Sequence, residues 1–174
     1  MTLSEVIFSQ VEFRTFSNIW YWLSVAVTWA CVSHWIIGVP SDMIHSARRH
    51  GGQAMQDLDQ ITAINLRRLM TIAGTPGLVL AGFSAFFITT AGTLGFVYRV
   101  ELAQGLFCLA LPLVLVAALT WRSCQRLTAD PLTGDALVKA LLHLRFWIQV
   151  IAMTAIFFTA LFGMYANLAR MAVF

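Results

Sequence analysis

Residues 102–121 read LAQGLFCLALPLVLVAALTW, and none of these twenty side chains is charged. A helix needs about 20 predominantly apolar residues to cross the hydrocarbon core of a bilayer. Trp121 ends the stretch, and indole rings favour the level of the lipid headgroups. The stretch therefore indicates a transmembrane helix, and with it an integral membrane protein.

Three further stretches have the same character, and nearly every charge lies between the four. The predicted spans are residues 19–39, 78–98, 102–121 and 146–165. The 174 residues are 59% hydrophobic and only 11% charged, whereas a typical soluble domain carries about 25% charged residues. We therefore predict one all-α domain over residues 1–174, an integral membrane bundle of four transmembrane helices with short interfacial helices.

Turn-forming residues divide the polar stretch after the first span. Pro40 is expected to end that span, because proline has no amide donor. Short helices are predicted over Met43–His50 and from Gln53 onward, with Gly51-Gly52 between them. Met1–Ser17 has a loose apolar face with charged residues opposite, which fits either a short helix on the membrane surface or a frayed terminus.

The distribution of Arg and Lys predicts the orientation. The loops over residues 40–73 and 122–145 contain eight of these residues, and the opposite side contains three, Arg14, Arg99 and Arg170. Loops rich in Arg and Lys stay in the cytoplasm. Both loops are therefore predicted to be cytoplasmic and both termini periplasmic, in a bacterial inner membrane.

Several classes of function are disfavoured. The net charge of +3 comes from residues that flank apolar spans, so a nucleic-acid surface is not expected. The sequence has no nucleophile elbow, phosphate loop, HExxH, CxxC or dinucleotide motif. Its three cysteines lack metal-like spacing, and no Asp or Glu lies inside a span, as an ion pathway would require. We expect neither an enzyme nor a metal site.

Two sets of residues are candidate sites. His34 and His143 lie near the same membrane face, where two histidines on facing helices could hold a haem between apolar walls. Four arginines of the first loop could contact anionic lipid or an acidic partner: Arg48, Arg49, Arg67 and Arg68. The second span also contains two pairs of small residues four positions apart, Ala81/Ala85 and Ala91/Gly95, a spacing that lets helices pack closely in lipid.

Four segments carry a resemblance to a known family. They are FSNIWYW (residues 16–22), SHWIIGVP (33–40), RRHGGQA (48–54) and NLRRL (65–69). The chain resembles over its whole length a small alphaproteobacterial family of four-helix membrane proteins that carries the label "component of SufBCD complex". The resemblance implies a bacterial inner-membrane protein, from a lineage rich in respiratory and photosynthetic complexes. It carries over no catalytic residue.

The leading expectation is a non-catalytic subunit, or an accessory or assembly factor, of a larger inner-membrane complex such as one of respiratory or photosynthetic electron transport. Its expected partners are membrane lipids and other membrane subunits. No cofactor is expected in this interpretation, although the spans could accommodate a haem, a pigment or a lipid. Two alternatives stay open: a b-type haem protein using His34 and His143, and a membrane anchor for iron–sulfur assembly proteins.

Overall fold

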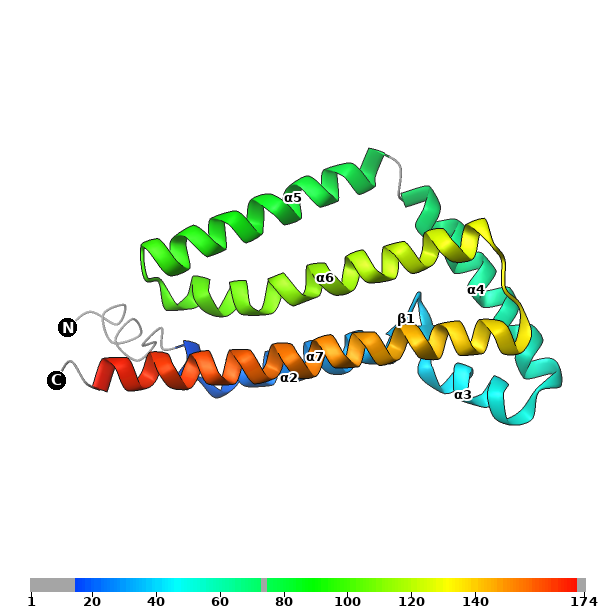
Figure 1. Cartoon of the computed structure of the whole chain (residues 1–174), viewed down its shortest axis with the longest axis horizontal. Coiled ribbons are helices and arrows are strands. Elements are labelled where there is room, and N and C mark those ends of the chain that lie inside the picture. Colours follow the sequence, from blue (N-terminus) through cyan, green and yellow to red (C-terminus); the bar gives the residue numbers. More distant parts are fainter. Residues whose placement is uncertain (1–14, 73–74, 172–174) are drawn as a thin grey trace, which may run out of the picture.

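Three long helices run along an elongated body in the computed structural model, which describes residues 15–72 and 75–171 (Figure 1). They are α5 (Thr75–Gly92), which continues into the π-helix η2 (Thr93–Val97), α6 (Glu101–Ala129) and α7 (Gly134–Met171). Each is long and apolar enough to cross a membrane. The prediction of a helical protein with apolar helices of membrane-spanning length is confirmed for these three. The two interpretations of Met1–Ser17 concern residues that lie almost entirely outside the described ranges.

The first predicted span is shorter than expected. Its helix, α2 (Ile19–His34), has 16 residues and packs against α7. The last part of the predicted span instead forms an antiparallel hairpin of β1 (Trp35–Ile36) and β2 (Val39–Pro40). Ile37 and Gly38 turn the chain with φ angles of 53° and 71°, and two consecutive positive φ angles suit a tight two-residue hairpin. The prediction of one helix over residues 19–39 is therefore wrong after His34.

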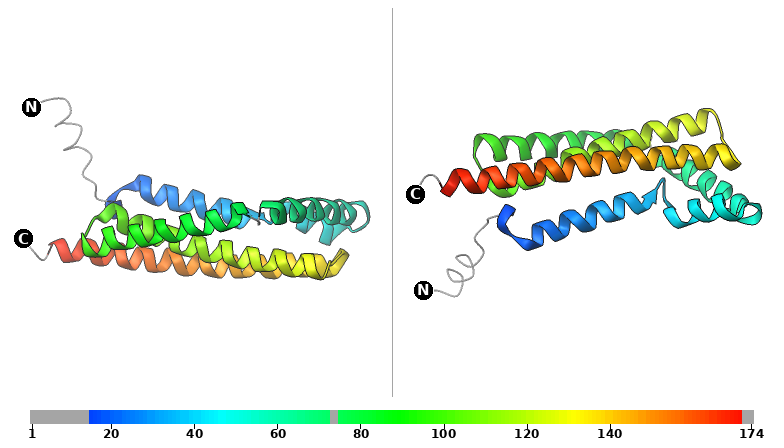
Figure 2. Two further views of the ribbon diagram at one scale, coloured as in Figure 1. Left: turned by 90° about the horizontal axis from the view of Figure 1, so that it is seen from above. Right: turned by 60° about the horizontal axis from the view of Figure 1, so that its bottom comes forward.

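Helices also fill the two predicted loops. α3 (Ser41–His50) and α4 (Gly52–Ile72) form a helical hairpin at one end of the body (Figure 2). Gly51 and Gly52 have φ angles of 59° and 52° and separate them, so the two predicted short helices are confirmed. In the second loop only residues 130–133 lie outside α6 and α7. We call α3, α4, the β-hairpin and residues 122–145 the cap.

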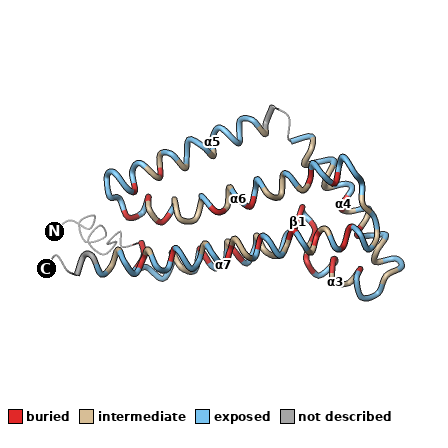
Figure 3. Tube along the Cα trace, in the orientation of Figure 1, coloured by how far each residue is buried: buried red, intermediate tan, exposed pale blue. Residues whose placement is uncertain are grey.

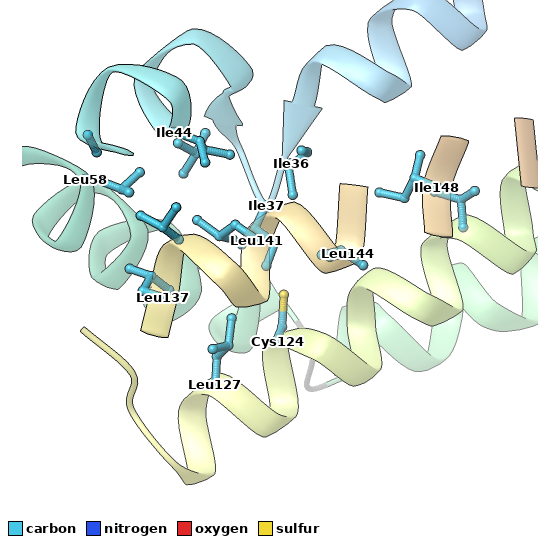
Figure 4. Packing of buried hydrophobic residues seen from close by; sticks show 14 of the residues in the cluster. Ile36, Ile37, Ile44, Leu58, Cys124, Leu127, Leu137, Leu141, Leu144 and Ile148 are labelled. Carbon is cyan, nitrogen blue, oxygen red and sulfur yellow. The ribbon is translucent and has the colours of Figure 1, made fainter. Parts of the chain in front are cut away.

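The buried core of the protein is concentrated in the cap (Figure 4). Ile44 of α3, Leu58 of α4 and Leu141 of α7 are completely buried. Ile36, Ile37 and Val39 of the hairpin pack into the same cluster. Segments distant in sequence thus share one apolar core at this end of the body.

Three contacts join the helices at the opposite end, where η1 (Thr15–Ser17) lies against α6 and α7. The buried Glu101 accepts a hydrogen bond from the amide of Phe16 at 3.0 Å. The Tyr21 hydroxyl donates to the carbonyl oxygen of Gly105 at 3.1 Å. A Cβ atom on Gly163 would lie 3.0 Å from the ring of Phe16. Small residues therefore allow α2, α6 and α7 to approach closely here.

Candidate functional site

The four arginines proposed as a contact surface lie in two separate places. Arg48 and Arg49 end α3, whereas Arg67 and Arg68 lie near the end of α4, and all four are exposed. The stretch of α4 from Gly52 to Arg67 spans about 22 Å at the helical rise of about 1.5 Å per residue. The cap therefore has two basic patches, one at the tip of the helical hairpin and one beside the start of α5.

The two histidines proposed as haem ligands have different partners. Nδ1 of His34 lies 3.2 Å from the hydroxyl of Ser41, and Nε2 of His143 accepts a hydrogen bond from the indole of Trp147 at 3.0 Å. Both rings are exposed. Iron ligation through Nε2 of His143 would require loss of the Trp147 bond. These contacts support structural roles for both rings, and haem binding stays a prediction.

A third histidine joins two elements of the cap. Nη1 of Arg145 on α7 lies 2.7 Å from Nε2 of His45 on α3. Arginine has only donors, so Nε2 of His45 is the acceptor in this contact. The two residues are 100 positions apart, and nothing local in the sequence indicates the pair. Arg145 is thus a cross-link within the cap as well as a topology signal.

Hydrogen bonds with α4 also hold two turns of the cap, the turn of the β-hairpin and the turn before α7. The amide of Asn65 donates to the carbonyl oxygen of Gly38 at 3.0 Å and holds the β-hairpin turn. The carboxylate of Asp59 accepts from the amide of Gly134 at 3.0 and 3.3 Å. A negative charge at the first residue of α7 also complements the helix dipole. Sequence reasoning missed both contacts, because each depends on the position of α4.

The surface of α5 is the most exposed apolar surface of the chain (Figure 3). In the most apolar 18-residue stretch of each helix, 6% is buried for α5 with η2, compared with 17% for α6 and 22% for α7. Large exposed side chains cover most of its length: Leu78, Val79, Leu80, Phe83, Phe86 and Phe87. In Figure 1 α5 slopes away from α6 toward α4. The hydrogen bond between the Gln104 side chain and the carbonyl oxygen of Gly95 lies at the end near η2.

The two small-residue pairs of α5 face different surroundings. Ala91 and Gly95 are buried, and the side chain of Gln104 on α6 donates to the carbonyl oxygen of Gly95 at 2.7 Å. Ala81 and Ala85 are exposed. Ala91 and Gly95 therefore pack within the chain, whereas Ala81 and Ala85 lie on an outward face.

The chemistry available to the described residues is limited. No group of three or more His, Cys, Asp or Glu that could hold a metal ion occurs among the described residues. The chain matches no known protein family, and no similar curated protein or solved structure is found. The exposed surfaces of the described residues are therefore the features from which a function is proposed.

Proposed function

We propose that this chain is a non-catalytic subunit or accessory factor of a larger bacterial inner-membrane complex, with α5 as its partner-facing helix. The observation that carries the proposal is the exposure of α5 combined with its attachment at one end. Lipid alone would solvate its apolar side chains. The exposed Ala81/Ala85 pair, however, offers the flat surface on which transmembrane helices associate by close packing.

The proposed topology has four spans, with α2 as the fourth. Sixteen residues extend about 24 Å at 1.5 Å per residue, somewhat less than the roughly 30 Å of a bilayer core. The exposed Trp20 near the start of α2 and the exposed Trp35 just after its end suit the two headgroup levels. The basic residues of the cap support a cytoplasmic location for it, and the termini are then periplasmic.

A reporter fusion tests this topology. A reporter that is active only in the periplasm should be active when fused after Phe174 and inactive when inserted at the 130–133 turn. Three spans, without α2, would leave the C-terminal end of α7 on the same side, because α5, α6 and α7 fix it relative to the cap. An additional tag at the N-terminus therefore decides the count. A cytoplasmic N-terminus would contradict four spans.

Purification of the tagged chain in mild detergent tests the function. Other membrane subunits should co-purify with the wild-type protein. The double substitution Ala81→Leu with Ala85→Leu should reduce their recovery, because the added side chains prevent close approach. Each of Ala81→Leu and Ala85→Leu is also tested singly, and Ala117→Leu, which adds the bulk of one such substitution at an exposed position of α6, is the control for the single variants. Recovery of the wild type as a lone monomer would contradict the proposal.

A second candidate function, suggested by the label of the family that the chain resembles, is a membrane anchor for iron–sulfur assembly proteins. The exposure of Arg48, Arg49, Arg67 and Arg68 favours it. Charge reversal at each pair should separately weaken the association, because one pair lies at the end of α3 and the other near the far end of α4. Unchanged association after reversal of both pairs would exclude docking through these residues.

A further inference from the structure

An apolar groove lies between α6 and α7. Its volume is about 510 Å³, within the range of about 300–1,000 Å³ that is usual for small-molecule sites. Phe96 of η2 contributes to its lining. The other lining residues are mostly aliphatic or aromatic: Phe107, Cys108, Leu111, Pro112, Leu115, Trp147, Val150, Ile151, Thr154, Ala155, Phe158, Thr159 and Phe162.

The helix faces that line the groove become basic toward the cap. On α6, Arg122 and Arg126 follow the lining residue Leu115 at seven and eleven positions, spacings that keep them on one face. On α7, His143 and Lys139 precede the lining residue Trp147 at four and eight positions. All four basic or ionisable side chains are exposed.

A hydrogen bond between Trp147 and His143 lies where the apolar lining of the groove meets the basic residues, and it orients both rings. The indole of Trp147 lines the groove and donates to Nε2 of His143 at 3.0 Å. This bond connects the apolar groove to its basic mouth. Asp130 and Asp135 lie beside the turn between the helices, four positions after Arg126 and four before Lys139, so the four basic or ionisable groups outnumber the two carboxylates at this end of α6 and α7.

An apolar groove that opens at a basic mouth has the two parts that a charged lipid requires. The groove lies at the depth of acyl chains in the proposed topology, and the mouth lies at the cytoplasmic headgroup level. Basic pockets between transmembrane helices on this side suit anionic headgroups. A partner helix would fill the groove but would leave the clustered charge at its end unexplained.

The geometry points to a binding site for an anionic glycerophospholipid, with one acyl chain in the α6–α7 groove and the phosphate at Arg122, Arg126, Lys139 and His143. This site is separate from the arginine pairs of α3 and α4 and from the outward face of α5. It does not depend on the proposed partner complex.

Lipid retention by the full-length protein tests the site. The protein would be reconstituted with phosphatidylglycerol or with phosphatidylcholine, and bound lipid would be counted by native mass spectrometry. The wild type should retain phosphatidylglycerol preferentially. Arg122→Gln with Lys139→Gln should weaken retention at least ten-fold, since about 1 kcal/mol per basic residue is about five-fold each. Arg99→Gln removes an exposed charge in the turn between η2 and α6, at the opposite end of the helices, and should change little.

A second variant tests the groove separately from the mouth. Leu115→Trp would fill the groove and should reduce retention with all charges intact, whereas Leu106→Trp is an exposed control on α6 outside the lining. Equal retention of both lipids would overturn the anionic headgroup. Retention that is unaffected by the Leu115 and Arg122 variants, or lost equally with the Arg99 variant, would overturn this location.

Discussion

The cap and α5 are both rich in apolar residues, yet they use them in opposite ways. In the cap, Ile44, Leu58 and Leu141 are completely buried, as in a water-soluble domain, where removal of apolar surface from water drives folding. On α5, Phe83 and Phe86 are 64% and 69% exposed. In the proposed membrane location, lipid would remove the cost of that exposure, and the surface of α5 would stay available for lipid or other helices. The cap holds the helices together at one end.

The largest expected effect is the loss of a fully buried side chain of the cap. Leu141→Ala should lower the free energy of unfolding by about 2–5 kcal/mol, because it removes apolar contacts and leaves a cavity. Phe86→Ala on α5 removes a larger side chain but should have little effect in detergent, since that ring is mostly exposed. Thermal unfolding in detergent measures both. Equal losses would contradict the distinction between cap and α5.

Close packing at the end opposite the cap sharpens the comparison. A Cβ atom at position 105 would lie 2.7 Å from Cγ2 of Thr15 and 3.1 Å from the ring of Tyr21. Gly105→Ala should therefore destabilise the protein by about 1–3 kcal/mol through overpacking. Gly82→Ala on α5 meets nothing within 4 Å and should be neutral or slightly stabilising, since alanine favours helix. The melting temperature should fall for Gly105→Ala and should stay the same or rise slightly for Gly82→Ala.

A smaller effect is expected where α4 fixes the start of α7. Asp59→Ala removes the acceptor of the Gly134 amide and should cost about 0.5–2 kcal/mol, the usual range for a lost helix cap. Asp57→Ala is the matched control, because the Asp57 side chain bonds only Gln53 of its own helix among the described contacts. Hydrogen exchange at the first turn of α7 should increase in the Asp59 variant alone. No increase would mean that the cap is held without this contact.

Local signals explain which parts of the fold could be predicted. The paired glycines after His50 were sufficient to separate α3 from α4, because both adopt positive φ angles. Hydrophobicity alone, however, did not distinguish the end of a span from a buried hairpin at residues 35–40. The available signal was Gly38 close to Pro40. Both residue types favour turns, and the positive φ of Ile37 is tolerated where its side chain is buried in the cap.

The candidate surfaces were less predictable, because they depend on how helices meet. Arg48 and Arg67 belong to one predicted loop, but α4 holds them far apart. Arg122 and Lys139 were interpreted only as topology signals. They form part of the proposed phosphate site only when α6 and α7 lie side by side. The short turn at residues 130–133 imposes that arrangement. Pairing across 100 residues, as between His45 and Arg145, has no local sequence signal.

The smallest expected effect concerns a polar group inside the cap. Thr62 is 2% exposed, and its hydroxyl has no hydrogen-bond partner among the described residues. A buried polar group without a partner costs about 1–3 kcal/mol. Thr62→Val keeps the shape and removes the hydroxyl, so it should leave stability unchanged or raise it by up to about 1 kcal/mol. Thr71→Val is the control, because its exposed hydroxyl donates to the backbone carbonyl oxygen of Arg67. A clear loss of stability for the Thr62 variant alone would show that this hydroxyl is hydrogen-bonded in solution, and that the cap core is less apolar than its burial indicates.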